Sequence, residues 1–138
     1  MRRSFFDTNM LLYLFDNRES GKKAAAQELL EEEVEAGRAC LSTQVLQEFY
    51  VNATQKLASP LPPEVAGARV RDFSSLPLVQ IDVSLILATV ARSQKMSFSC
   101  WDALIVEAAL KAGADRLLTE DMQHGQLIEG MRVENPFL

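Results

Sequence analysis

The sequence has 138 residues, which is enough for one domain with a buried core and too few for two. Its 48% hydrophobic and 24% charged residues are typical of a soluble globular protein, and no apolar run approaches the roughly 18–20 residues of a membrane span. The net charge of −5 argues against a general basic surface for nucleic acids, but not against an acidic site that reaches phosphates through divalent cations. We therefore expect a single domain over residues 1–138 with no membrane segment.

The N-terminus and the cysteines favour a cytoplasmic protein. Asp7 and Asn9 interrupt a short apolar segment that lacks the apolar core and the cleavage site of a signal peptide. The two cysteines, Cys40 and Cys100, make neither a disulfide framework nor a metal cluster. Both have apolar neighbours in the sequence, so we expect them to be small core residues in a reducing compartment.

The predicted elements alternate between strand and helix. In chain order they are a strand at 5–6, helices at 10–15 and 22–36, a strand at 38–41, a helix from 43 or 44 to 57, a helix at 62–73, a strand at 78–81, helices at 83–95 and 101–112, and strands at 116–119 and 131–133. Polar residues that can cap helices are Ser20, Ser42 or Thr43, Asp82 or Ser84, and Ser99. The run Glu31-Glu32-Glu33 is interpreted as the solvated face of its helix. The alternation predicts an α/β fold with three layers (α/β/α) and a central, mostly parallel sheet of four to five strands.

Four acidic residues are predicted to meet at one edge of this sheet. Asp7 follows the first strand and Asp121 follows the strand at 116–119. Glu48 and Asp102 lie in the first turns of two helices, and helices that follow parallel strands begin near the strands' carboxyl ends. Two like charges about 4 Å apart repel by roughly 4 kcal/mol at an effective dielectric near 20, so such a cluster needs cations or raised pKa values. A magnesium ion would relieve this repulsion, because Mg²⁺ prefers oxygen ligands and usually binds one or two carboxylates while it keeps several waters.

Each of these acids also has an ordinary interpretation. Asp7 and Asp121 can be turn residues, and Asp7 can be an N-cap. Asp102 stands three residues after Ser99, as in a capping box, and Glu48 can be a solvated helix residue. Two neighbouring residues have open roles: Glu120 as an auxiliary ligand or a solvated acid, and His124, the only histidine, as a loop or surface residue. Their joint placement favours the acidic site over these separate interpretations.

The motifs around the four acids resemble those of the PIN-domain family, and within it of VapC-type toxins from toxin–antitoxin pairs. The motifs are Phe6-Asp7-Thr8-Asn9, Gln44-Val45-Leu46-Gln47-Glu48-Phe49, Ser99-Cys100-Trp101-Asp102-Ala103-Leu104-Ile105 and Leu117-Leu118-Thr119-Glu120-Asp121-Met122. The third motif is the most specific, and the resemblance covers essentially the whole chain.

The resemblance implies a metal-dependent endoribonuclease that hydrolyses RNA phosphodiester bonds. The implied ligands of one or two Mg²⁺ or Mn²⁺ ions are Asp7, Glu48, Asp102 and Asp121, with Asp7 and Asp102 as first choices for direct contact. Hydroxyl and amide groups of Thr8, Asn9, Ser99 and Thr119 would orient carboxylates and waters.

The resemblance also implies partners, namely RNA, a small antitoxin and a second copy of the chain in a homodimer. The antitoxin typically wraps the toxin with an amphipathic segment, for which Tyr13, Phe15, Leu46 and Tyr50 could line an apolar groove. Basic residues that could contact the RNA backbone are Lys22, Lys23, Arg69, Arg71, Arg92 and Lys95.

Two alternatives remain open from the sequence. One is a different α/β metal-dependent phosphoesterase, such as a phosphatase that forms an aspartyl-phosphate, but that chemistry wants a second acid where Asn9 stands. The other is a non-catalytic PIN scaffold that binds only a protein partner. The complete acidic set argues against such a scaffold, because clustered charge is costly to keep.

Overall fold

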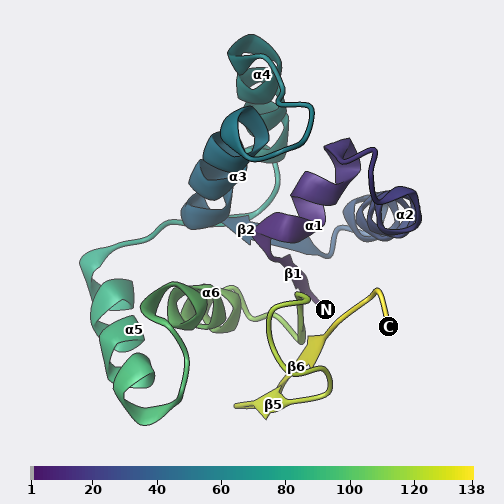
Figure 1. Cartoon of the computed structure of the whole chain (residues 1–138). Coiled ribbons are helices and arrows are strands. Elements are labelled where there is room, and N and C mark those ends of the chain that lie inside the picture. Colours follow the sequence, from purple (N-terminus) through teal and green to yellow (C-terminus); the bar gives the residue numbers. More distant parts are fainter. Residues whose placement is uncertain (1) are drawn as a thin grey trace.

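Residues 2–138, which the computed structural model describes, form six α-helices and a six-stranded sheet (Figure 1). The strands are β1 (Ser4–Phe6), β2 (Ala39–Ser42), β3 (Leu78–Val79), β4 (Arg116–Leu118), β5 (Leu127–Ile128) and β6 (Met131–Glu134). The helices are α1 (Thr8–Leu12), followed by the 3₁₀ helix η1 (Tyr13–Phe15), α2 (Ser20–Glu35), α3 (Thr43–Gln55), α4 (Pro63–Phe73), α5 (Val83–Lys95) and α6 (Cys100–Lys111). None of the helices in this part of the chain is long and apolar enough to cross a membrane.

The strand order is β3-β2-β1-β4-β6-β5, and every neighbouring pair is parallel except β5 with β6. The predicted α/β fold with a mostly parallel sheet is confirmed. The sheet has six strands instead of four to five because Leu127–Ile128, expected to lie in a loop, folds back onto β6. The turn between them holds Glu129 at φ 48° and Gly130 at φ 87°. A hairpin turn with two positive φ angles usually carries Asn or Asp before Gly, so Glu129 hides it in the sequence.

The central strand β1 owes its position to its apolar residues. Phe5 and Phe6 are fully buried, and the parallel register sets them beside Leu117 and Leu118 of β4, which are fully buried as well. A strand with parallel neighbours on both sides and helices over both faces is buried throughout. β1 ends after Phe6, and the charged residue Asp7 follows directly.

The helices surround the sheet as layers. In Figure 1, α5 and α6 lie together on one side of β1, and α1 and α2 lie on the other. Helices α3 and α4 pack against each other at the end of the sheet opposite to β5 and β6. Three predicted caps are present: Ser42 accepts from Val45 N, Asp82 from Leu85 N and Ser99 from Asp102 N. The predicted cap Ser20 is wrong, since Ser20 is already the first residue of α2.

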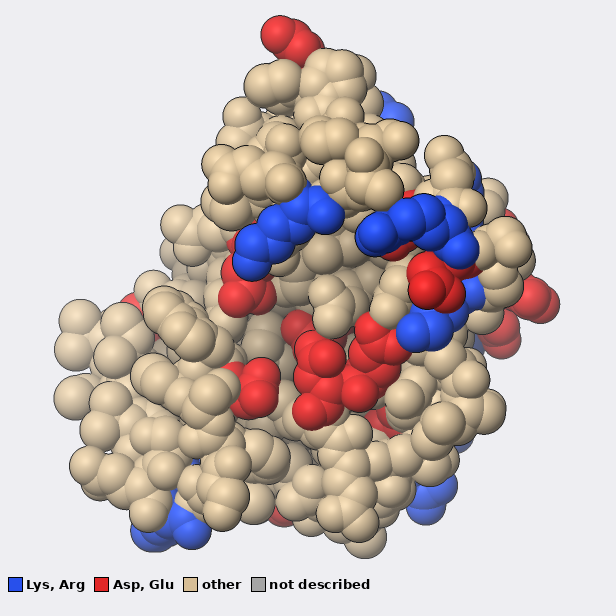
Figure 2. Space-filling model, in the orientation of Figure 1, with Lys and Arg blue, Asp and Glu red and all other residues tan. Residues whose placement is uncertain are grey.

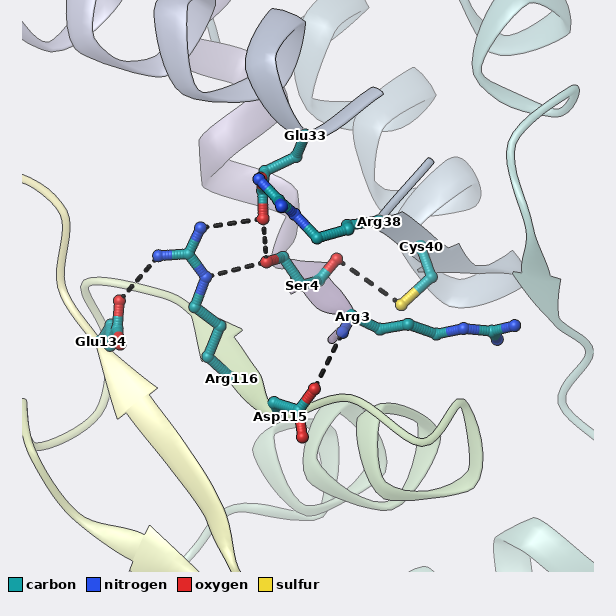
Figure 3. A network of polar contacts seen from close by, with 8 residues as sticks. All are labelled: Arg3, Ser4, Glu33, Arg38, Cys40, Asp115, Arg116 and Glu134. Carbon is teal, nitrogen blue, oxygen red and sulfur yellow. Dashed lines mark hydrogen bonds and ion pairs between the residues drawn. The ribbon is translucent and has the colours of Figure 1, made fainter. Parts of the chain in front are cut away.

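Glu33 corrects the interpretation of the glutamate run as a solvated face. Its side chain is buried and accepts hydrogen bonds from Arg38 Nε at 2.9 Å, from Arg116 Nη2 at 2.9 Å and from Ser4 Oγ (Figure 3). Glu33 stands seven residues after the buried Ala26, so helical spacing places it on the face of α2 that packs on the sheet. The network ties α2 to the amino-terminal ends of β1 and β4, opposite to the edge that carries Asp7.

The two cysteines differ from each other. Cys40 in β2 is buried, as predicted, and its Sγ lies 3.5 Å from the Ser4 carbonyl oxygen (Figure 3). Cys100 is exposed at the start of α6, so its predicted place in the core is wrong. The apolar residues that follow Cys100 in the sequence begin the buried face of α6 only at Ala103.

Candidate active site

The carboxyl edge of the sheet is built around Asp7, which is only 6% exposed. Its backbone N–H donates to the Leu118 carbonyl at 3.1 Å, so the ends of β1 and β4 meet there. Its side chain caps α1 by accepting from Thr8 N at 2.7 Å, and its other oxygen accepts from Thr119 Oγ1 at 2.7 Å. Both carboxylate oxygens are therefore fixed in direction.

Glu48 is joined to Asp7 through the residue between them in space. Thr8 Oγ1 donates to Glu48 Oε1 at 2.7 Å, which holds the carboxylate of α3 against the start of α1. Gln44, one helical turn earlier, lies 3.4 Å from Glu48 Oε2 through its Nε2 and 3.4 Å from the Trp101 carbonyl oxygen. The role of Gln44 was not foreseen, although its spacing of four residues from Glu48 places both on one helix face.

Asp121 is held from two sides. Its backbone N–H donates to Thr119 Oγ1 at 3.1 Å, the same hydroxyl that donates to Asp7. Its carboxylate accepts from Asn9 Nδ2 at 3.2 Å. Thr119 and Asn9 thus connect the segment after β4 to the segment after β1.

Asp102 lies in the first turn of α6 and is half-buried. Ser99 caps the helix by accepting from the Asp102 backbone N–H at 3.1 Å, so it acts on the backbone of Asp102 and not on its carboxylate. In residues 2–138 the Asp102 carboxylate has no hydrogen-bond partner, so the reciprocal half of a capping box is not made. The carboxylate is therefore available to a ligand.

Burial, and to a lesser extent the neighbouring charges, raise the pKa values of two of these acids, Asp7 and Asp121. Burial raises the pKa of Asp7 from 3.8 to about 6; the hydrogen bonds from Thr119 and Thr8 oppose the rise, and the charges of Asp121 and Glu48 add to it. The pKa of Asp121 is also raised, first by burial and then by the charges of Glu120, Asp102 and Glu48. The negative charge of Asp7 and Asp121 is therefore unfavourable in this site, and a bound cation would stabilise it.

Figure 2 shows acidic side chains gathered around a hollow on one face of the molecule, with basic side chains along its upper rim. Between residues 2 and 138, no three Asp, Glu, His or Cys side chains come close enough to enclose an ion directly. A set of oxygen donors that converge without closing fits a hydrated ion such as Mg²⁺, which keeps several of its waters and takes one or two carboxylates. The four acids offer none of the histidine nitrogen or cysteine sulfur ligands on which most zinc sites are built.

The two neighbours with open roles are engaged elsewhere. Glu120 forms an ion pair with Lys22 at 3.0 Å and accepts from the Tyr13 hydroxyl, which turns it towards α2. His124 is exposed, and its Nδ1 accepts from Asn135 N at 3.0 Å. Both contacts hold the segment after β4 in place.

The model of the PIN domain family matches residues 4–127 of this sequence. The chain belongs to the PIN domain family. The matched segment contains all four motifs that carry the resemblance. No curated protein sequence matches significantly.

Three solved structures share the fold over 86% or more of the chain. A toxin–antitoxin complex from Klebsiella pneumoniae is 23% identical, with a TM-score of 0.68 and coverage of 96% of this chain and 97% of that one. VapC20 of Mycobacterium tuberculosis, described as a sarcin-ricin loop cleaving toxin, is 19% identical, with a TM-score of 0.66 and coverage of 86% and 91%. DNA-bound VapBC from Salmonella typhimurium is 22% identical, with a TM-score of 0.69 and coverage of 99% of both chains.

Proposed function

We propose that this PIN protein is a metal-dependent endoribonuclease and the toxin of a toxin–antitoxin pair. The observation that carries the proposal is the fixed acidic cluster at the carboxyl edge of the sheet, where Asp7 is buried with its pKa raised to about 6. Burial and repulsion of this kind are costly unless the site receives a cation, which can in turn bind a substrate phosphate. The likeness to structures described as toxins supports the substrate class.

The chain's own residues would bind and orient the reacting groups. When bound, Mg²⁺ or Mn²⁺ supplies positive charge that favours ionisation of water and departure of the leaving oxygen in phosphodiester hydrolysis. Asp7 and Asp102 would contact the ion directly, because Asp7 is rigidly held and the carboxylate of Asp102 is free. Glu48 and Asp121, oriented by Thr8 and Asn9, would bind its waters.

Cleavage of a mixed cellular RNA pool by the purified protein tests the proposal. We expect discrete cuts with Mg²⁺ or Mn²⁺, none with EDTA, and a loss of about 100-fold or more for Asp7→Asn, since even residues that only orient a ligand contribute about 10- to 100-fold. Asp72→Asn is the matched control, because the Asp72 carboxylate forms an ion pair with Arg69 on the surface of α4. Cuts that persist in EDTA and in Asp7→Asn would refute the assignment. A purified protein that binds metal but cuts no RNA would favour the non-catalytic scaffold or a different metal-dependent phosphoesterase.

A small antitoxin is the protein partner that we propose, as in the complexes from Klebsiella pneumoniae and Salmonella typhimurium. An apolar groove of about 400 Å³ between α3 and α4 supports it; its lining includes Leu46, Tyr50 and Val70. Of the residues expected in such a groove, Tyr13 and Phe15 instead pack on Phe137 and Phe49. We expect Tyr50→Asp to weaken binding of the antitoxin encoded beside this gene while cleavage persists, as measured by isothermal titration and by RNA cleavage.

A further inference from the structure

A second hollow lies beside the acidic cluster, between α3 and the start of α6. Its volume is about 350 Å³, and its lining consists of Gln44, Gln47, Glu48, Val51, Asn52, Lys56 and Trp101. Glu48 belongs to both the hollow and the acidic cluster. An RNA strand with one phosphate at the carboxylates would therefore place its next nucleotide in this hollow.

Trp101 forms one wall and is 67% exposed. It directly precedes Asp102 in the first turn of α6, and its carbonyl oxygen lies 3.4 Å from Gln44 Nε2, which steadies the backbone at that point. A large indole left in solvent beside a phosphodiester site offers a flat surface on which a nucleobase can stack. Trp101 is also the only tryptophan in the sequence.

Lys56 forms another wall at the end of α3. It is exposed and has no acidic partner within 4.0 Å among residues 2–138, whereas Lys22, Arg69 and Arg92 are all engaged in ion pairs. Lys56 also lines a neighbouring hollow of about 310 Å³ that contains Asn9. A free ammonium between two hollows at the edge of an acidic site suits a backbone phosphate.

Gln44 adds an independent sign that the hollow receives a ligand. The residue is 5% exposed, and within residues 2–138 its Oε1 has no hydrogen-bond partner. A buried amide oxygen without a donor costs about as much as a lost hydrogen bond, so an occupant that brings a hydroxyl or amino donor would be favoured.

We propose that this hollow binds the nucleotide next to the cleaved bond in single-stranded RNA, with the base on Trp101 and its phosphate on Lys56. The assignment rests on the proposed function, because it takes the acidic cluster as the place of cleavage. The assignment adds two groups that would position the RNA strand, namely the ring of Trp101 and the ammonium of Lys56, both of which line the hollow that contains Glu48. Single-stranded RNA is favoured because only an unpaired base can stack on a protein ring.

Intrinsic fluorescence reads this contact without any need for cleavage. A short single-stranded RNA oligonucleotide is titrated into the Asp7→Asn protein, in which Trp101 is the only indole. We expect saturable quenching, about tenfold or more weaker binding for Trp101→Ala by anisotropy of a labelled oligonucleotide, and near-normal binding for Trp101→Phe, because stacking tolerates another ring. We expect Lys56→Met to weaken binding as well and to flatten its salt dependence.

Matched controls and the cleavage assay separate this proposal from the proposed function. Leu127→Ala, at 66% exposure, and Lys111→Met, which lines a different hollow and pairs with Asp82, should bind the oligonucleotide like the parent. RNA cleavage with unchanged KM and kcat in Trp101→Ala would overturn the subsite and leave the nuclease standing. Saturable quenching of Trp101 fluorescence by RNA, with no RNA cleavage by the parent protein, would support the subsite and overturn the nuclease. A Trp101→Ala protein that binds RNA normally but changes its oligomeric state would also overturn the proposal, because Trp101 would then be a protein contact.

Discussion

At the scale of single residues, Asp7 has two roles, as a helix cap and as a buried carboxylate. It caps α1 through Thr8 N, and it holds a carboxylate that burial and neighbouring acids make unfavourable. An N-cap alone does not require a buried charge, since Ser or Thr would serve α1 equally well. The excess cost is what a bound cation would remove. The charge of Asp7 should therefore lower the free energy of unfolding of the metal-free protein.

We expect Asp7→Asn to stabilise the metal-free protein at pH 7.5 by about 1–3 kcal/mol. The folded-state pKa of Asp7 is about 6 against 3.8 for the free group, so stability falls as pH rises between these values and stays low above them. Asparagine removes the charge but cannot accept from both Thr8 and Thr119, which trims the gain. Urea denaturation in EDTA at pH 5 and pH 7.5 measures the difference in the free energy of unfolding between Asp7→Asn and the parent protein. An equal or lower stability at both pH values would mean that Asp7 is not strained by its surroundings.

Thr119 is the residue through which two of the acids are coupled. Its hydroxyl donates to Asp7 and accepts from the Asp121 backbone N–H. We expect Thr119→Val to lower RNA cleavage by about 10- to 100-fold and Thr119→Ser to keep most of it. Loss of this donor also raises the pKa of Asp7 further, so the acid limb of the pH–rate profile should move to higher pH in Thr119→Val. A profile that stays in place would leave Thr119 with a packing role only.

At the scale of elements, α2 depends on one buried charge. Burial alone would raise the pKa of Glu33, but hydrogen bonds from Arg38, Ser4 and Arg116 outweigh it and lower the pKa from 4.5 to about 2. A carboxylate with a depressed pKa stabilises the fold above the unfolded value and ceases to do so as pH falls towards the folded value.

We therefore expect Glu33→Gln to destabilise the protein at pH 7 by about 2–3 kcal/mol, less than a fully buried pair because Arg38 and Arg116 remain partly solvated. The difference from the parent protein should shrink as pH falls from about 4.5 to about 2. Guanidinium denaturation across this range measures it. Glu32→Gln, one residue earlier and exposed, is the matched control and should show no such loss.

The elements themselves were predictable where local chemistry decides them. The buried strand at Phe5 and Phe6 and the cap at Ser42 follow from apolar runs and from the geometry of helix starts. The sequence misled where a distant partner decides. Glu33 is read as solvated unless one knows that Arg116, 83 residues later, will face it. The four acids of the candidate site could be named, and Thr8 and Thr119 could be expected to orient carboxylates, but the particular carboxylate that each hydroxyl contacts depends on side-chain direction and could not be predicted.

At the scale of the whole molecule, α5 leaves an apolar stripe without a partner. Val83, Ile86, Leu87 and Val90 recur at helical spacing and are 71%, 46%, 64% and 41% exposed. Residues 83–91 contain no charged side chain. A stripe of this kind can meet its own copy across a two-fold axis, and a chain of net charge −5 associates best through a face that carries no charge. We propose that this face forms the homodimer that the family resemblance implies.

We expect Leu87→Glu to shift the protein from dimer to monomer, because the two-fold axis would bring the new carboxylates of both copies together. Like charges forced together cost several kcal/mol, so the dissociation constant should rise by about 100-fold or more. Sedimentation equilibrium distinguishes the 15.4 kDa monomer from the dimer. Ser84→Glu adds the same charge to α5 beside the stripe and should leave the dimer intact. A parent protein that is monomeric at micromolar concentration would assign the stripe to another partner. A Leu87→Glu monomer that still cleaves RNA would show that each site works alone, as expected if Asp7, Glu48, Asp102 and Asp121 of one chain suffice.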